Sequence, residues 1–257
     1  MEILRGGYTN AGQVLRVGDT VRRPWRETSP ATGALLEHLE RAGFDEAPRF
    51  LGADEEGRET LSFIAGDAVL EPYQPWALTD AALVSVAELL RRFHDAVASF
   101  DPAPHTWPQA VPAAFRDGTI SHNDPNLDNV IFAGGRAVAL IDFDLASPGS
   151  AVWDVACAAR LWAPLRADED LPEALRGRPL ERLRLFADAY GLAAPKRARM
   201  VDALADAHAW CYRIVRGAVG SGHEPFERMW REGGEQRADR TRAWLVAHQT
   251  QMRNAVG

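Results

Sequence analysis

A short stretch in the middle of the chain carries residue types that suit phosphate chemistry. Asp124 is followed five positions later by Asn129, and Asp142 comes after an intervening apolar run. Phosphoryl transfer needs one carboxylate that orients the attacking hydroxyl or accepts its proton. It also needs oxygen ligands that hold magnesium between the phosphates. Asp124, Asn129 and Asp142 together can supply these groups.

The acidic residues of this stretch also have a plain structural interpretation. Asp is a common former of turns and helix caps. This alternative covers Asp124, Asp128, Asp142 and Asp144. However, acidic groups and an Asn between apolar runs are costly to desolvate unless a cation or hydrogen-bond donors compensate. The pattern therefore favours a chemical site. For Asp144, a secondary magnesium role and a loop-bracing role both remain open.

The order of these motifs resembles that of a known family. The pattern H-x-D-x-x-x-x-N at residues 122–129, followed by I-D-F-D at residues 141–144, is similar to that of the aminoglycoside phosphotransferase and choline-kinase-like family. The resemblance covers the order of elements over most of the chain, and its specific part is residues 120–156. It implies a two-lobed protein-kinase-like fold. It also implies ATP or GTP as phosphate donor, Mg²⁺ as cofactor and a hydroxylated small molecule as acceptor.

The family's residue roles carry over to individual positions of this motif. By this resemblance Asp124 would be the catalytic base, and Asn129 with Asp142 would hold the magnesium ions. His122 would brace the catalytic loop. Asp154 would match the family's structural Asp, which follows the metal-binding turn.

A pair of glycines near the N-terminus is a candidate nucleotide loop. Small residues allow backbone N–H groups to approach triphosphate oxygens. Taken alone, a Gly-Gly turn predicts only a hairpin, but the resembling family carries a GG-x-x-N nucleotide loop at the same place. The residues expected to bind the nucleotide here are therefore Gly6, Gly7, Tyr8, Thr9 and Asn10.

The chain departs from the family at the phosphate-binding lysine. Of its 29 basic residues 28 are arginine, and Lys196 lies far downstream of the third strand, where the family places its lysine. We expect Arg22 to contact the phosphates instead, with Arg23 as the second choice. Arginine keeps its charge and can bridge two phosphate oxygens, but its planar group does not reproduce the reach of lysine. The alternative for both residues is a solvated strand end.

The family's lysine normally pairs with a helix glutamate, and that residue is also missing. Thr32 stands where the glutamate would fall, and the nearest acidic residues are Glu27 and Glu37. The sequence does not choose between them.

The segment that joins the lobes in the family has a counterpart at residues 61–66. Backbone groups there would meet the adenine edge, so Ser62 and Ile64 are assigned to nucleotide binding. The same residues are typical of a buried edge strand that ends at Gly66. The two interpretations are compatible, because an adenine pocket is an apolar wall with a few polar backbone contacts.

The surrounding elements predict an α+β protein. Residues 1–66 alternate turn signals with short apolar runs, typical of an antiparallel sheet, and include a short helix at 31–42. Apolar residues at helical spacing predict a long helix at 80–98, and the chain from residue 150 onward is almost entirely helical. We therefore expect a β-rich nucleotide-binding lobe at 1–66 and a mainly helical catalytic and acceptor-binding lobe at 67–257.

Composition narrows the classes of partner. The net charge of −7 disfavours nucleic acid, which requires clustered basic surface. No apolar run is long enough to span a membrane and the N-terminus lacks the pattern of a signal peptide, so we expect a cytoplasmic protein. Cys157 and Cys211 are expected to be buried thiols. The oligomeric state remains open.

Two functions of different classes fit these observations. The first is a kinase that phosphorylates a hydroxyl of an antibiotic or metabolite. A polycationic aminoglycoside would favour an acidic wall, yet residues 150–257 hold 17 basic and 14 acidic residues, a net of +3, with one acidic cluster at 168–173. The second function, motivated by the missing lysine and glutamate, is a catalytically weak or inactive nucleotide-binding regulatory protein.

Overall fold

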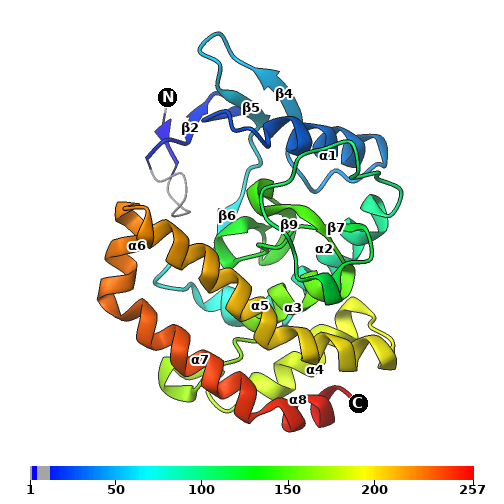
Figure 1. Ribbon diagram of the computed structural model, residues 1–257, viewed down its shortest axis with the longest axis vertical. Coiled ribbons are helices and arrows are strands. Elements are labelled where there is room, and N and C mark those ends of the chain that lie inside the picture. Colours follow the sequence, from blue (N-terminus) through cyan, green and yellow to red (C-terminus); the bar gives the residue numbers. More distant parts are fainter. Residues whose placement is uncertain (1, 5–11) are drawn as a thin grey trace.

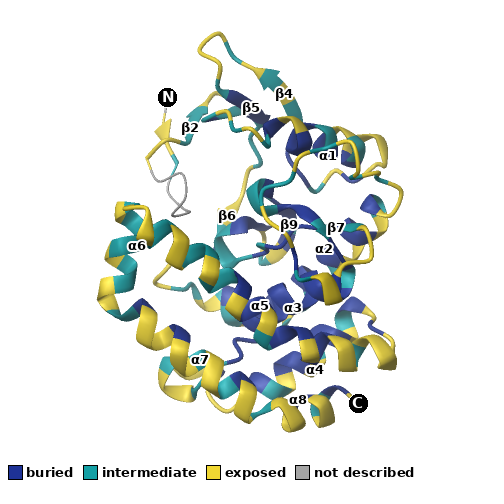
Figure 2. Cartoon of the chain, in the orientation of Figure 1, coloured by how far each residue is buried: buried dark blue, intermediate teal, exposed yellow. Residues whose placement is uncertain are grey.

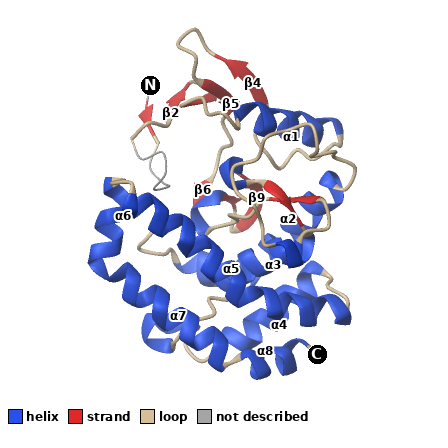
Figure 3. Cartoon of the chain, viewed as in Figure 1, coloured by secondary structure: helices blue, strands red, loops and turns tan. Residues whose placement is uncertain are grey.

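The computed structural model describes residues 2–4 and 12–257 and divides into a β-rich upper part and a helical lower part (Figures 1 and 3). The strands are β1 (Glu2–Ile3), β2 (Leu15–Val17), β3 (Thr20–Arg23), β4 (Phe50–Ala53), β5 (Glu59–Ser62), β6 (Asp67–Ala68), β7 (Thr119–Ser121), β8 (Val130–Ala133), β9 (Arg136–Leu140) and β10 (Ser147–Gly149). The helices are α1 (Ser29–Arg41), α2 (Asp80–Val97), α3 (Ala151–Trp162), α4 (Pro179–Tyr190), α5 (Ala194–Gly220), α6 (Glu224–Met229), α7 (Glu235–Ala247) and α8 (Gln249–Val256).

The N-terminal lobe is a five-stranded antiparallel sheet with α1 beside it. The strand order is β1-β2-β3-β5-β4. The β2–β3 hairpin turns at Gly18, whose positive φ of 61° suits a residue without a side chain. In the pairing of β3 with β5, Arg22 lies opposite Thr60 and Arg23 lies opposite Glu59. The predicted antiparallel sheet and the helix at 31–42 are confirmed. The helix begins two residues earlier than predicted, at Ser29, because Pro30 suits the first turn of a helix.

Two small sheets in the C-terminal lobe carry the central motif. β6 pairs with β8 and β8 with β9, whereas β7 pairs with β10. The loop at 122–129 therefore connects two different sheets, and Asp142 follows β9 directly. Since Ile141 donates its backbone N–H to the carbonyl oxygen of Asn129 at 2.9 Å, the β8–β9 hairpin brings the two ends of the motif together.

Helix α2 is the centre of the C-terminal lobe and confirms the helix predicted from apolar periodicity. Its N-terminus is capped by Thr79, whose hydroxyl accepts a hydrogen bond from the backbone N–H of Ala82 at 3.2 Å. It packs against α4, β9 and β7. Figure 2 shows the buried residues concentrated along α2, α3 and α5, with exposed residues on the outer faces of α5–α8.

The side chain of Phe93, on α2, joins three parts of the molecule. Its ring lies 6.1 Å from Phe44 of the N-terminal lobe, 6.3 Å from His122 and 5.9 Å from Phe143, measured between ring centroids. It is fully buried. These contacts fall within the range in which aromatic rings stabilise one another. In the described part of the chain, no helix is both long and apolar enough to cross a membrane.

Truncating this central ring should destabilise both lobes. We expect Phe93→Ala to lower the free energy of unfolding by about 3–5 kcal/mol, because it removes buried apolar surface and leaves a cavity. Urea denaturation followed by tryptophan fluorescence measures the change. Val246→Ala, at a side chain that is 64% exposed, is the control and should change stability by less than about 0.5 kcal/mol. Equal effects of the two variants would contradict the central role of Phe93.

Candidate active site

The carboxylate of Asp154 anchors the loop that follows β7. Asp154 lies in the first turn of α3 and is fully buried. Its two oxygens accept hydrogen bonds from the backbone N–H groups of His122 and Asn123, both at 2.8 Å, and from Nε2 of His94 at 3.0 Å. Burial raises the pKa of Asp154, but hydrogen bonds and the nearby imidazoles outweigh this and lower it overall. The loop is therefore held by a carboxylate that stays charged.

Asn123 turns the chain so that the next residue faces the site. Its φ of 67° lies in the left-handed region, which Asn tolerates better than most residues. The side-chain amide donates to the carbonyl oxygen of Leu145 and to Oγ of Ser147, both at 2.8 Å, and its oxygen accepts from the indole of Trp153 at 3.0 Å. Every polar atom of this side chain has a partner, so the strained turn is fixed.

Asp124 and Asn129 meet across the loop. Nδ2 of Asn129 donates to the backbone carbonyl oxygen of Asp124 at 2.9 Å and to its carboxylate at 3.0 Å. These bonds use the nitrogen of the amide and leave its oxygen, Oδ1, available for another ligand. The structure thus brings together two of the predicted site residues.

His122 links this loop to the turn that carries Asp142. Its Nε2 donates to the carbonyl oxygen of Ile141 at 3.0 Å, and its Nδ1 accepts from the backbone N–H of Asp124 at 3.3 Å. Burial lowers the pKa of His122, which keeps the ring neutral and suits this pattern of one donor and one acceptor. Asp142 itself has a φ of 60°, a second non-glycine residue in the left-handed region.

Arg23 is the cation that the structure places beside Asp142. Its guanidinium group lies 3.1 Å from the Asp142 carboxylate and 2.8 Å from that of Asp144, and it forms an ion pair with the buried Glu59. Arg22 points to the opposite face of β3, as expected for neighbouring residues in a strand, and pairs with Asp54 at 3.3 Å. Of the two arginines considered from the sequence, the second choice is therefore the one near the carboxylates.

The acidic partner of this arginine was not anticipated from the sequence. It is Glu59 on β5, whereas Glu37 lies 4.0 Å from Arg41 on the same helix. Thr32, at the position of the family's glutamate, is buried in α1. No signal in the sequence identifies Glu59, because its place opposite Arg23 is set by the pairing of β3 with β5.

A cavity of about 570 Å³ lies between the lobes beside these residues. Its lining includes Arg23, Val21, Leu61, Ser62 and Ile64 from the N-terminal side and Asp128, Asn129, Ile131, Ile141 and Asp142 from the C-terminal side. The backbone N–H and C=O of Ile64 bond to no other described residue. The wall of the cavity is thus largely apolar, interrupted by the free backbone groups of Ile64 and by the charged side chains of Arg23, Asp128 and Asp142.

The predicted nucleotide loop is not covered by the structure. Its residues Gly6, Gly7, Tyr8, Thr9 and Asn10 lie outside the described residues.

The carboxylates of the site have unusual proton affinities. Burial raises the pKa of Asp124 to about 7, and the negative charges of Asp142 and Asp128 add to the rise. Burial likewise raises the pKa of Asp142 to about 6, with a further rise from Asp144 and an opposing effect of Arg23. A carboxyl group with a pKa near neutrality can accept a proton from a nearby hydroxyl, and a carboxylate such as that of Asp142 can contribute one ligand to a divalent cation.

The sequence as a whole places the chain in a family. The phosphotransferase enzyme family matches at residues 105–187, which span both parts of the motif. The chain is also similar to the trifolitoxin immunity protein of Rhizobium leguminosarum bv. trifolii, with 33% identity over 261 residues that cover 98% of this chain and 96% of that relative. The chain belongs to the phosphotransferase enzyme family.

Solved structures show the same fold. A choline/ethanolamine kinase family protein from Mesorhizobium loti matches with a TM-score of 0.60 and 18% identity, covering 95% of this chain and 88% of that one. The GDP complex of aminoglycoside 2′-phosphotransferase-IIIa matches with a TM-score of 0.63 and 13% identity, covering 94% and 92%. At these identities the likeness concerns the fold alone, and it confirms the predicted two-lobed, protein-kinase-like α+β architecture.

Removing the buried anchor of the loop should unfold the site. We expect Asp154→Ala to lower the free energy of unfolding by about 3–5 kcal/mol, because two buried backbone N–H groups and His94 lose their acceptor. Thermal and urea denaturation measure the loss. Asp239→Ala, which removes an exposed ion pair with Arg216 at 3.6 Å, is the matched control and should cost less than about 1 kcal/mol. A stable Asp154→Ala protein would show that other contacts hold the loop.

Proposed function

We propose that this chain is a magnesium-dependent kinase that transfers the γ-phosphate of ATP, or alternatively GTP, to a hydroxyl of a small molecule in the cytoplasm. One observation carries the proposal: Arg23, Asn129 and Asp142 line the cavity between the lobes, and Asp124 is hydrogen-bonded to Asn129 at its edge. Membership of the phosphotransferase enzyme family supports the same reaction class.

Each residue has a role that follows from its position. Asp124 would orient the acceptor hydroxyl and take its proton as the new oxygen–phosphorus bond forms; the bond from the γ-phosphorus to the β,γ-bridging oxygen breaks, and the nucleoside diphosphate leaves. Asn129 holds the Asp124 carboxylate through its amide nitrogen, which fixes the direction in which that carboxylate faces. The apolar wall and the free backbone edge of Ile64 would accept the nucleobase, with Ser62 beside it.

The donor set at the cavity suits magnesium. Mg²⁺ usually binds one or two carboxylates together with substrate phosphates and water, rather than a cage made wholly by the protein. Oδ1 of Asn129 and the carboxylate of Asp142 provide such a partial set, and no cluster of three or more His, Cys, Asp or Glu ligands occurs within residues 2–4 and 12–257. When bound, the ion would neutralise charge on the phosphates.

Arg23 is proposed to replace the family's lysine at the phosphates. It is buried at the cavity wall, it is held by Glu59, and its remaining contacts reach the Asp142 side of the site. This pair supplies a cation and its positioning acid from two neighbouring strands. The pair therefore weakens the case for an inactive regulatory protein, which was motivated by the missing lysine and glutamate.

The proposed acceptor is a hydroxylated antibiotic or metabolite. The relative from Rhizobium is named an immunity protein. We therefore propose that phosphorylation by this chain protects its host from a toxic compound, since phosphate adds charge and bulk to a recognised hydroxyl.

Separate variants should distinguish catalysis from nucleotide binding. We expect Asp124→Ala to reduce phosphate transfer by about 10²-fold or more while nucleotide affinity stays nearly unchanged. Asp142→Ala should lose magnesium-dependent nucleotide binding as well. Isothermal titration with non-hydrolysable ATP and GTP analogues, each with and without magnesium, measures both. Equal loss of binding in the two variants would contradict these roles.

The two neighbouring arginines offer a matched pair for the phosphate-binding cation. Arg23→Gln should weaken nucleotide binding by about tenfold or more, because a charge-assisted contact to phosphate is lost. Arg22→Gln should leave the affinity within about twofold, since Arg22 pairs with Asp54 on the other face of β3. The same titration measures both variants, and circular dichroism checks that each is folded. A stronger effect of Arg22→Gln would return the role to that residue.

A further inference from the structure

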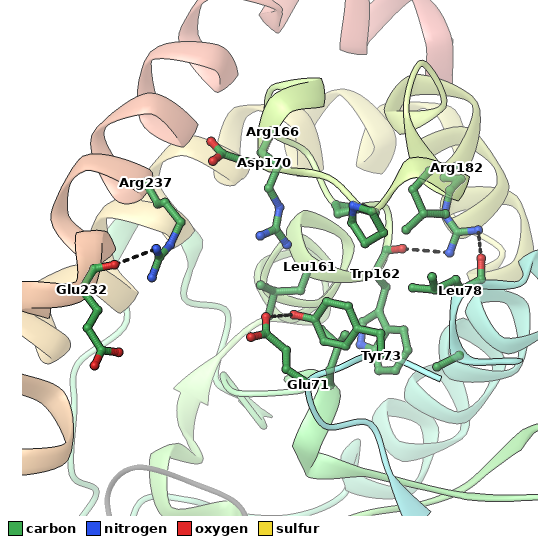
Figure 4. Close-up of a pocket in the computed structure, with 15 residues that line it drawn as sticks. Glu71, Tyr73, Leu78, Leu161, Trp162, Arg166, Asp170, Arg182, Glu232 and Arg237 are labelled. Atoms are coloured by element: carbon green, nitrogen blue, oxygen red, sulfur yellow. Dashed lines mark hydrogen bonds between the residues drawn. The ribbon is translucent and has the colours of Figure 1, made fainter. Parts of the chain in front are cut away.

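A second cavity, of about 410 Å³, borders the loop that carries Asp124 on the side of the C-terminal helices (Figure 4). Leu127 of that loop lines it, as does Trp162 at the end of α3. The indole of Trp162 donates to the carbonyl oxygen of Pro125 at 2.9 Å, so the cavity wall is bonded to the residue that follows Asp124. An acceptor molecule in this cavity would lie against the loop that carries the proposed catalytic carboxylate, although Asp124 itself does not line the cavity.

Two guanidinium groups point into this cavity. Arg166, just after α3, extends toward its centre, and Arg237, on α7, reaches in from the side (Figure 4). Arg237 donates one hydrogen bond to the backbone carbonyl oxygen of Glu232 at 3.1 Å. Within the part of the chain that the structure describes, neither arginine forms an ion pair with a carboxylate. The hydrogen bond with Arg240 is the main cause that lowers the pKa of Asp170, and the charges of Arg166 and Arg237 lower it further. Neither of these two arginines, however, is in contact with a described carboxylate that would block an anionic ligand.

The lining also includes three acidic residues, Glu71, Asp170 and Glu232, and one of them is held in an ion pair. Asp170 forms an ion pair with Arg240 at 2.5 Å, which neutralises part of the acidic cluster noted in the sequence. Glu71 accepts a hydrogen bond from the hydroxyl of Tyr73 at 2.8 Å. Glu232 is exposed, and Figure 4 shows its carboxylate directed away from the guanidinium groups. The lining thus carries charges of both signs, and its two guanidinium groups without a carboxylate partner among the described residues belong to Arg166 and Arg237.

A third arginine, which does not line the cavity, adds positive charge to the same part of the helical lobe. Arg160 on α3 is only 7% exposed, and its Nε has no hydrogen-bond partner. No carboxylate of the described residues lies within ion-pair distance of it, although an unpaired buried charge is costly. Burial raises the pKa of Tyr212, on α5, while the positive charges of Arg160, Arg166 and Arg237 oppose the rise. The three arginines thus converge on one part of the helical lobe.

We infer that the acceptor of this kinase carries a carboxylate in addition to its hydroxyl, and that Arg166 and Arg237 bind this carboxylate. The inference rests on the proposed kinase function, because that function places the acceptor beside Asp124. Guanidinium groups bind carboxylates by paired, charge-assisted hydrogen bonds. A polycationic aminoglycoside would meet two unpaired positive charges in the same cavity, which disfavours its binding.

The test compares ligands that differ only in charge. The probes are D-gluconate, D-sorbitol and D-glucamine, which share a polyol chain but are anionic, neutral and cationic, together with the pair N-acetylserine and N-acetylserinamide. Their binding is measured without nucleotide, by quenching of tryptophan fluorescence and by thermal shift, because Trp162 lines the cavity. Wild-type protein should bind each carboxylate about tenfold more tightly than its neutral partner.

Two variants test whether the preference for carboxylate probes arises in this cavity. Arg166→Gln and Arg237→Gln should each weaken carboxylate binding by about tenfold or more while leaving the neutral probes unchanged. Arg213→Gln, at an exposed position of α5 outside the cavity, is the control and should behave as wild type. Since Arg160 is buried and its replacement could prevent folding, the test does not depend on it.

Three outcomes would overturn the inference: tighter binding of the neutral or cationic probes, no carboxylate binding at about 10 mM, or an unchanged preference in both variants. Failure of the kinase proposal is recognised separately. If the wild-type protein showed no magnesium-dependent nucleotide binding, the kinase proposal would be refuted. The carboxylate experiment does not depend on that result, because it is carried out without nucleotide. Bound nucleotide without a carboxylate preference would leave the kinase intact and remove only the anionic acceptor.

Discussion

The structure of the site depends on one buried carboxylate. Asp154 accepts hydrogen bonds from two consecutive backbone N–H groups of the loop after β7 and from the imidazole of His94 on α2. Buried N–H groups without acceptors would cost free energy, so the loop cannot move away from α3 without a penalty. Because α2, α3 and β7 all meet at this carboxylate, the position of Asp124 is coupled to the packing of the whole C-terminal lobe.

Local signals predicted the elements well because each element satisfies its own sequence pattern. The apolar periodicity and the cap of α2 lie within one segment, and the turn between β4 and β5 has its own Asp, Glu and Gly residues. The motif spacing also predicted which residues gather. Asn129 and Ile141 flank a short hairpin, so their proximity, and with it that of Asp142, follows from β pairing alone.

The parts that the sequence could not predict depend on strand register and on packing between distant segments. Whether Arg22 or Arg23 faces the cavity is decided by the phase of β3, and a shift of one residue would exchange them. Glu59 reaches Arg23 only because β5, not β4, lies next to β3. Arg160 stands in an apolar helix, where sequence alone does not reveal that none of the described carboxylates lies within ion-pair distance of it, or that the charge of Asp124 acts on it.

The buried arginine at the wall of the cavity between the lobes has a further consequence for the electrostatics of the site. Burial lowers the pKa of Arg23, but Asp144, Asp142 and Glu59 outweigh burial and raise it overall. A lysine ammonium shifts its pKa readily when buried, whereas a guanidinium group stays protonated at any pH that a cell experiences. Arg23 therefore keeps its positive charge at every physiological pH. A change of pH can alter the charge of the group formed by Arg23, Glu59, Asp142 and Asp144 only by protonating its carboxylates.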